Sequence, residues 1–179
     1  MMARLALLVG VVLTTAGAQY SCSSDGNGLI THRDLDSGDG PTFSSTLILR
    51  DSAGAETVRF ARTELITFEL TVRNRTDQPV TLQMPSTARA EFFAFTEGAN
   101  SPRWRSNEDQ AFPAVVTQIV FQPDESKVFE LDWTQELRDG TFLGRGRYEA
   151  RGVLANIGFP ANPLASHELG SNLRVFTID

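Results

Sequence analysis

Residues 65–74 of the chain read Leu65-Ile66-Thr67-Phe68-Glu69-Leu70-Thr71-Val72-Arg73-Asn74. This stretch carries the strongest structural signal in the sequence, because apolar side chains at positions 66, 68, 70 and 72 alternate with polar ones. Successive side chains of a β-strand point to opposite faces, so the pattern predicts a strand with one buried and one solvated face. Half-buried strands of this kind are typical of antiparallel sheets.

The residues that follow predict a turn and a second strand. Residues 74–79 are rich in Asn, Asp and Pro, which favour turn backbone. Residues 80–84 alternate again, and we expect them to pair with residues 65–74 in a hairpin. The turn also contains an N-glycosylation sequon at Asn74-Arg75-Thr76.

Similar runs recur along the rest of the chain, and we find no long segment with helical spacing. The expected strands are 91–96, 114–121, 127–133, 147–154 and 173–178, with candidate edge strands at 46–50 and 58–62. About seven to nine short strands separated by turns predict an all-β fold, namely an immunoglobulin-like antiparallel β-sandwich. We assign this domain to residues 42–179.

The first 21 residues have the pattern of an export signal. Arg4 precedes an apolar run at 5–13, and small residues follow at 14–18. The run is far shorter than the roughly 20 residues that a helix needs to span a bilayer, so we expect a signal peptide. We expect cleavage before Cys22, the only cysteine of the chain, which would then carry the lipid of a lipoprotein. The alternative, cleavage after Ala18, predicts a soluble secreted or periplasmic protein.

Residues 22–41 predict a flexible acidic tether between this anchor and the folded domain, because glycines and aspartates dominate and apolar residues are few. A partial match to a calcium-binding loop lies within residues 23–34, but no amphipathic helices flank it, so we interpret the segment as a polar spacer. The expected location is therefore extracytoplasmic and membrane-anchored.

Composition and motifs exclude several classes of function. The net charge is −6 and Lys127 is the only lysine, which is not the basic footprint of a nucleic-acid-binding protein. The two histidines, His32 and His167, lack neighbouring ligands at metal-binding spacing. No nucleophile-elbow motif is present. We expect no catalytic residue, no metal and no cofactor, and therefore not an enzyme.

Residues 97–107 contain the strongest candidate for a protein-binding loop. Tryptophan and arginine dominate interface hot spots, so Arg103, Trp104 and Arg105 are candidate protein-binding residues. In the other interpretation Trp104 opens a strand and packs into the core, with both arginines facing solvent. The alternation of these three residues favours this second interpretation. Trp133 and Tyr148 are assigned to the core.

A set of short motifs occurs in a fixed order between residues 65 and about 155. It comprises 68–74 with 79–82, Pro85-Ser86, Ala90-Glu91-Phe92, Arg103-Trp104-Arg105-Ser106, Phe112, 123–126 leading to Trp133, and 144–148 with Gly152. This set resembles the BsuPI-type intracellular proteinase inhibitor domain. The resemblance implies a β-sandwich and inhibition of a serine protease in the cytoplasm, whereas the export signal places this chain elsewhere.

These expectations combine into one predicted function. We expect an exported, lipid-anchored, immunoglobulin-like module that binds a protein partner, and the resemblance implies that the partner is a protease. The alternative is a structural or assembly component of the bacterial cell envelope without inhibitory activity.

Overall fold

A computed structural model describes residues 41–155, 164 and 167–179. Within these residues the chain forms ten strands and no helix that could cross a bilayer. The strands are β1 (Phe43–Arg50), β2 (Arg59–Phe60), β3 (Ile66–Asn74), β4 (Val80–Met84), β5 (Ala90–Thr96), β6 (Pro102–Arg105), β7 (Thr117–Phe121), β8 (Ser126–Trp133), β9 (Gly146–Leu154) and β10 (Arg174–Ile178). The expected signal peptide, the lipid-attachment residue Cys22 and residues 22–40 of the tether lie outside the described residues.

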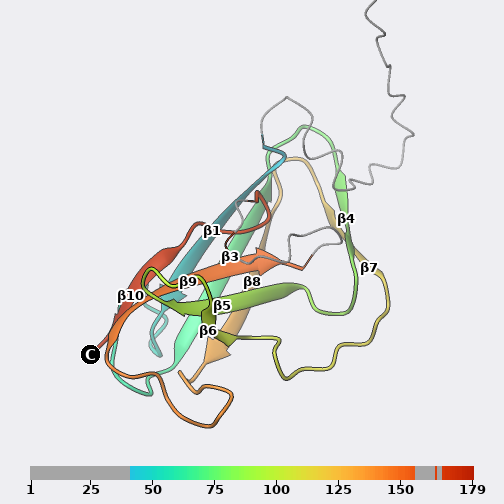
Figure 1. Cartoon of the computed structure of the whole chain (residues 1–179). Helices are drawn as coiled ribbons and strands as arrows, with labels where there is room; N and C mark the ends of the chain where they lie inside the picture. The colour runs from blue at the N-terminus through green and yellow to red at the C-terminus, as the bar shows by residue number, and fades with distance from the viewer. Residues whose placement is uncertain (1–40, 156–163, 165–166) are drawn as a thin grey trace, which may run out of the picture.

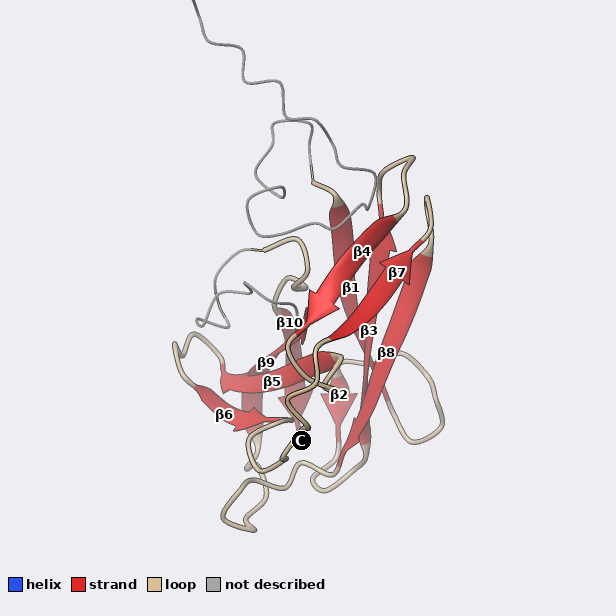
Figure 2. Ribbon diagram, turned by 90° about the vertical axis from the view of Figure 1, so that its right-hand side faces the viewer, coloured by secondary structure: helices blue, strands red, loops and turns tan. Residues whose placement is uncertain are grey.

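The described strands form three sheets, ordered β1-β3-β8, β2-β10-β9-β5-β6 and β4-β7. The first sheet makes one layer, and β5 and β9 of the second sheet run across β1 and β3 (Figure 1). The β4-β7 ribbon stands in front of the β1-β3-β8 sheet in Figure 2. All pairings between these strands are antiparallel except the short β2–β10 pairing, which is parallel. The expected all-β sandwich is confirmed, and the immunoglobulin-like strand order stays a prediction.

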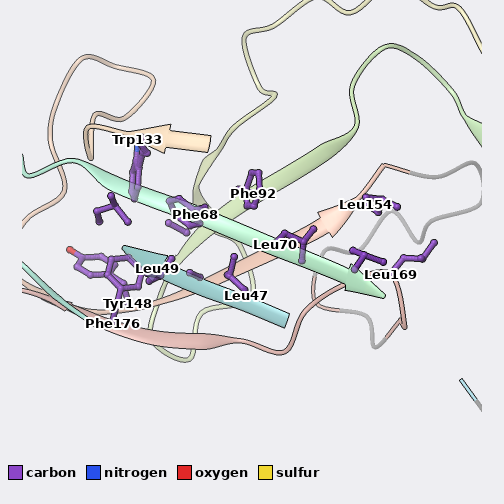
Figure 3. Packing of buried hydrophobic residues seen from close by; sticks show 14 of the residues in the cluster. Leu47, Leu49, Phe68, Leu70, Phe92, Trp133, Tyr148, Leu154, Leu169 and Phe176 are labelled. Atoms are coloured by element: carbon purple, nitrogen blue, oxygen red, sulfur yellow. The ribbon is translucent and has the colours of Figure 1, made fainter. Parts of the chain in front are cut away.

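The alternation in β3 builds the centre of the core. Ile66, Phe68, Leu70 and Val72 are fully buried. Antiparallel β8 lies in register with β3, pairing Phe68 with Leu131 and Ile66 with Trp133, so the apolar sides of both strands face the same way. Figure 3 shows Phe68, Leu70 and Trp133 in one cluster with Phe92, Tyr148 and Phe176 of the second sheet. The assignment of Trp133 and Tyr148 to the core is confirmed.

The expected hairpin between residues 65–74 and 80–84 is wrong. β3 pairs with β1 and β8, and β4 pairs with β7 instead. The side-chain amide of Asn74 donates to the carbonyls of Gln78 at 2.8 Å and of Gln122 at 3.1 Å, which lie beside β4 and β7. These hydrogen bonds join the end of β3 to the residues beside the β4-β7 ribbon. Two strands with the same alternation bury their apolar faces equally well as neighbours or as facing layers, so local pattern did not distinguish them.

The expected strand 114–121 begins only at Thr117. Thr117 pairs with Met84, the last residue of β4, and Pro85 follows it. Proline has no N–H to donate to a ladder, so the pairing ends there. Residues 114–116 therefore continue beyond the ribbon, exposed to solvent.

The structure explains why glycine stands at two positions of β9. Gly146 begins β9 with φ of 155°, a backbone conformation that side chains rarely adopt. A Cβ on Gly152 would lie 3.1 Å from the Phe92 ring and 3.3 Å from Leu70, so the absence of a side chain lets β9 approach the core closely. Between them, the Tyr148 hydroxyl donates to the carbonyl of Gly144 at 2.8 Å and holds the start of the strand to the preceding turn.

Candidate protein-binding surface

β6 carries the three residues that the sequence singled out, and it lies at an edge of the five-stranded sheet. Among the described strands it pairs only with β5, and the register shifts between Ala94 and Phe95. Along β6, Arg103 and Arg105 are exposed and Trp104 is partly buried. This is the alternation that the second interpretation predicted for the strand.

Trp104 packs against the core. Its ring stacks on Trp133 with centroids 4.3 Å apart, and it lies 5.6 Å from the ring of Phe68. The indole nitrogen of Trp133 donates to the carbonyl of Glu136 at 2.9 Å, and this hydrogen bond orients the Trp133 ring. Aromatic pairs at these distances add to the stability that area burial gives. Trp104 thus anchors β6 to the opposite layer.

The two arginines of β6 have different surroundings. The guanidinium of Arg105 donates two hydrogen bonds, of 3.0 and 2.8 Å, to one carboxylate oxygen of Glu91. It also lies 5.4 Å from the centroid of the Phe93 ring, a cation–π distance. Arg103 instead lines an open hollow on the surface. Of the two, Arg103 is the side chain available for a partner.

Three adjoining hollows run from β6 toward β7. The first, of about 550 Å³, is lined by Pro102, Arg103, Glu108, Leu137, Arg138 and Asp139. A second of about 290 Å³ shares Glu108, Leu137 and Arg138 with it. A third of about 230 Å³ shares Ser106 and Gln110 with the second and reaches Phe112. The surface is therefore continuous from Arg103 to Phe112.

Mixed charge lines the first two hollows. The Arg138 guanidinium lies 3.4 Å from Glu108 and 3.1 Å from Asp109, joining the turn after β6 to the loop after β8. The Thr141 hydroxyl and N–H both donate to Asp139, at 2.6 and 3.0 Å. These hydrogen bonds lower the pKa of Asp139, and the charge of Arg103 contributes in the same direction. Such a surface suits recognition of a polar rim on a protein partner.

Among the described residues, no group of three or more His, Cys, Asp and Glu side chains is placed to hold a metal ion. His167 accepts from the N–H of Leu169 at 3.1 Å, and the carboxylate of Glu168 accepts from the N–H of Phe43 at 2.9 Å. His32 lies outside the described residues. Glu130 and Asp132 are exposed on the outer face of β8.

Sequence reasoning missed one exposed feature at this surface, residues 111–116. It assigned residues 114–116 to the expected strand 114–121, because apolar residues run from Ala114 into the segment that forms β7. In the structure these residues lie beyond the paired region, with Val115 and Val116 more than half exposed. The signal that indicates this is Pro85, which ends the partner strand.

Comparison with known proteins gives one family match. A family model described as an intracellular proteinase inhibitor, BsuPI, matches residues 54–157. No curated protein sequence matches the chain. The match agrees with the resemblance drawn from the motifs between residues 65 and 155.

Among solved structures, three similarities are weak in both sequence and shape. A β-glucosidase from Erythrobacter marinus has 11% identity and a TM-score of 0.40, covering 76% of this chain and 16% of its own. A β-glucosidase from Listeria innocua has 11% identity and a TM-score of 0.38, covering 75% of this chain and 16% of its own. A CARDB domain from Pyrococcus furiosus, solved with metal ions, has 12% identity and a TM-score of 0.37. The match covers 76% of this chain and 94% of the CARDB chain. This chain thus spans 16% of the length of the two glucosidases.

Proposed function

The chain belongs to the BsuPI family of intracellular proteinase inhibitors, and we propose that it is a protein-binding module that inhibits a serine proteinase. The family match over residues 54–157 is the observation that carries this proposal. The family is one of inhibitors and not of enzymes, so the proposed activity is tight binding rather than turnover.

The surface between β6 and β7 supports the proposal. Rigid strands present loops at this surface, and binding residues are disproportionately found on loops that a rigid scaffold positions. The stack of Trp104 on Trp133 and the ion pairs of Arg138 hold the loops to the core and to one another. A preorganised surface loses less conformational freedom on association, which favours affinity.

We further propose that the module works outside the cytoplasm, held to a membrane by a lipid on Cys22. The apolar run at 5–13, the small residues at 14–18 and the single cysteine support this proposal. Its target would then be an extracytoplasmic proteinase, in contrast to the compartment in the family's name.

Inhibition is tested by titrating the purified chain against a panel of serine proteinases and measuring hydrolysis of small chromogenic peptides. We expect stoichiometric inhibition of at least one enzyme at submicromolar concentration. If none is inhibited at micromolar concentrations, the inhibitor proposal is wrong. A non-inhibitory structural or assembly role in the cell envelope would then be the better description.

Anchoring is tested separately by fractionating cells that express the native chain or the Cys22→Ala variant. We expect the native protein in the membrane fraction, and the variant in the soluble extracytoplasmic fraction. Metabolic labelling with a fatty acid should mark only the native protein. Unchanged membrane association of the variant would show that no lipid on Cys22 holds the protein.

A further inference from the structure

Residues 111–116, Ala111-Phe112-Pro113-Ala114-Val115-Val116, form an exposed apolar segment between β6 and β7. Val115 is 57% exposed and Val116 is 59% exposed, and Ala111, Pro113 and Ala114 are exposed as well. Among the described residues, the backbone of this segment makes one backbone hydrogen bond, from the N–H of Val115 to the carbonyl of Pro113 at 2.8 Å. Its remaining backbone groups are therefore available to a partner.

Both ends of the segment are attached to the sandwich. At one end Phe112 is partly buried and lines the 230 Å³ hollow together with Phe92, Phe129 and Leu131. Just before it, the Gln110 side chain donates to the carbonyl of Ser106 at 3.1 Å. At the other end Thr117 pairs with Met84, and its hydroxyl donates to the carbonyl of Ser86 at 3.2 Å. The exposed residues Pro113 to Val116 are thus held between two fixed points.

The local sequence restricts the conformation of the segment further. Pro113 has a fixed φ, and a residue before proline is confined to extended backbone. The bond from Val115 to Pro113 closes a three-residue turn around Ala114. The β-branched side chains of Val115 and Val116 have few rotamers to lose. A short segment that is exposed, apolar and already ordered loses little conformational freedom when it binds a partner.

We propose that residues 111–116 enter the active-site cleft of the target proteinase and that Val115 occupies the subsite that binds the residue before the scissile bond. This inference rests on the proposed inhibitory function and names the class of target. No basic residue is present in the segment, and its one aromatic residue, Phe112, is partly buried and lines the third hollow. The target therefore has a small apolar pocket at this subsite, as elastase does, and neither the acidic pocket of trypsin nor the deep pocket of chymotrypsin.

The test uses the full chain with elastase, chymotrypsin and trypsin as probes, and measures an inhibition constant for each. We expect the native chain to inhibit elastase at least thirtyfold more strongly than trypsin. The Val115→Arg variant should inhibit elastase at least about thirtyfold more weakly, the size of a hot-spot loss. It should also bind trypsin more strongly, because trypsin has an aspartate in its pocket.

Val128→Arg is the matched control. Val128 is 52% exposed on β8, so this variant introduces the same charge at a similarly exposed valine of another strand. We expect it to inhibit like the native chain. Thermal unfolding of both variants checks that the sandwich is intact.

The outcomes separate this inference from the proposed function. If the native chain inhibits a proteinase and Val115→Arg behaves like Val128→Arg, the segment is not the binding element although the protein is an inhibitor. Rapid cleavage within residues 113–116 without inhibition, mapped by mass spectrometry, would make the segment a substrate and would overturn the inference. If no proteinase of the panel is inhibited, both the inference and the inhibitory function fall.

Discussion

Asn74 is a fully buried polar residue at the junction of the two layers. Its amide nitrogen donates to the carbonyls of Gln78, Phe121 and Gln122. Its side-chain oxygen accepts from the N–H and the hydroxyl of Thr76, at 3.0 and 2.8 Å. The sequon at 74–76 is therefore a structural motif in the folded protein, because the nitrogen that would carry a glycan is buried and hydrogen-bonded.

We predict that Asn74→Ala lowers the free energy of unfolding by roughly 2–4 kcal/mol, since it removes the donor to one buried and two partly buried backbone carbonyls. Urea denaturation followed by tryptophan fluorescence measures the change. Asn100→Ala is the control, because Asn100 is exposed and its substitution should change stability by no more than about 0.5 kcal/mol. Equal effects of the two substitutions would show that the network contributes nothing.

Glu168 joins the loop before β10 to the start of β1. Its carboxylate accepts from the N–H of Phe43 at 2.9 Å, and its carbonyl accepts from the Ser45 hydroxyl at 2.5 Å. Burial raises the pKa of Glu168 above the ordinary value, and the backbone hydrogen bonds oppose this only in part. The protonated form is therefore favoured in the folded protein more than in the unfolded chain.

A glutamate whose pKa is raised on folding contributes stability below the unfolded pKa, about 4.5, and loses it as pH rises through the folded pKa. We predict that Glu168→Gln, which keeps an acceptor for Phe43 but cannot ionise, becomes progressively more stable than the native chain from pH 4 toward pH 7. Urea titrations across this range measure the difference. Glu130→Gln, on the exposed face of β8, controls for the loss of one negative charge. A difference that is constant with pH would contradict the argument.

Within β6, alternation assigns different roles to adjacent residues. Trp104 faces the core and stacks on Trp133, and Arg103 faces solvent beside the first hollow. We predict that Trp104→Ala lowers the free energy of unfolding by about 2–3 kcal/mol, through lost burial and a lost aromatic pair. Arg103→Ala should change stability by less than about 0.5 kcal/mol.

The same two variants also test the binding surface. If Arg103 contacts the proteinase, Arg103→Ala should weaken inhibition about tenfold while thermal unfolding stays unchanged. Trp104→Ala should lower the unfolding temperature first, and inhibition only through the altered position of β6. A stable Trp104→Ala protein with no inhibition would show instead that Trp104 contacts the partner directly.

At the level of whole strands, the sequence predicted which faces are buried but not how the strands pair. The expected faces of β3 are confirmed residue by residue, and β8 shows the same alternation, because burial follows the pleat. The predicted start of β7 at residue 114 was wrong. The observed start depends on Pro85, which ends the partner strand β4 and lies 32 positions before Thr117. The exposed position of Val115 follows from that ending, so no pattern within residues 111–121 indicates it.

The whole molecule is a sandwich in which the β4-β7 ribbon is a separate two-stranded sheet. Its inner face is buried, with Leu82, Met84 and Phe121 inaccessible, but both of its outer edges lack a neighbouring strand among the described residues. Isolated two-stranded ribbons are marginally stable in water, so side-chain packing and the Asn74 network hold this one in place.

We predict that amide hydrogens of β4 and β7 exchange with solvent faster than those of β3, which has a partner on both sides. Hydrogen–deuterium exchange of the native protein, resolved by peptide mass spectrometry, measures this order. Asn74→Ala should accelerate exchange in the ribbon more than in β3. Equal protection of the ribbon and of β3 would show that the sandwich opens only as one unit.

Residue alternation was sufficient to predict an all-β sandwich and the buried faces of its long strands, because the pleat of a strand acts over neighbouring residues. It could not predict that β4 crosses to the other layer, that Asn74 is buried, or that residues 114–116 extend beyond the sheet. Those features depend on contacts between segments far apart in the chain, and several pairings of the same strands bury the same apolar faces. Only packing in three dimensions selects one of them.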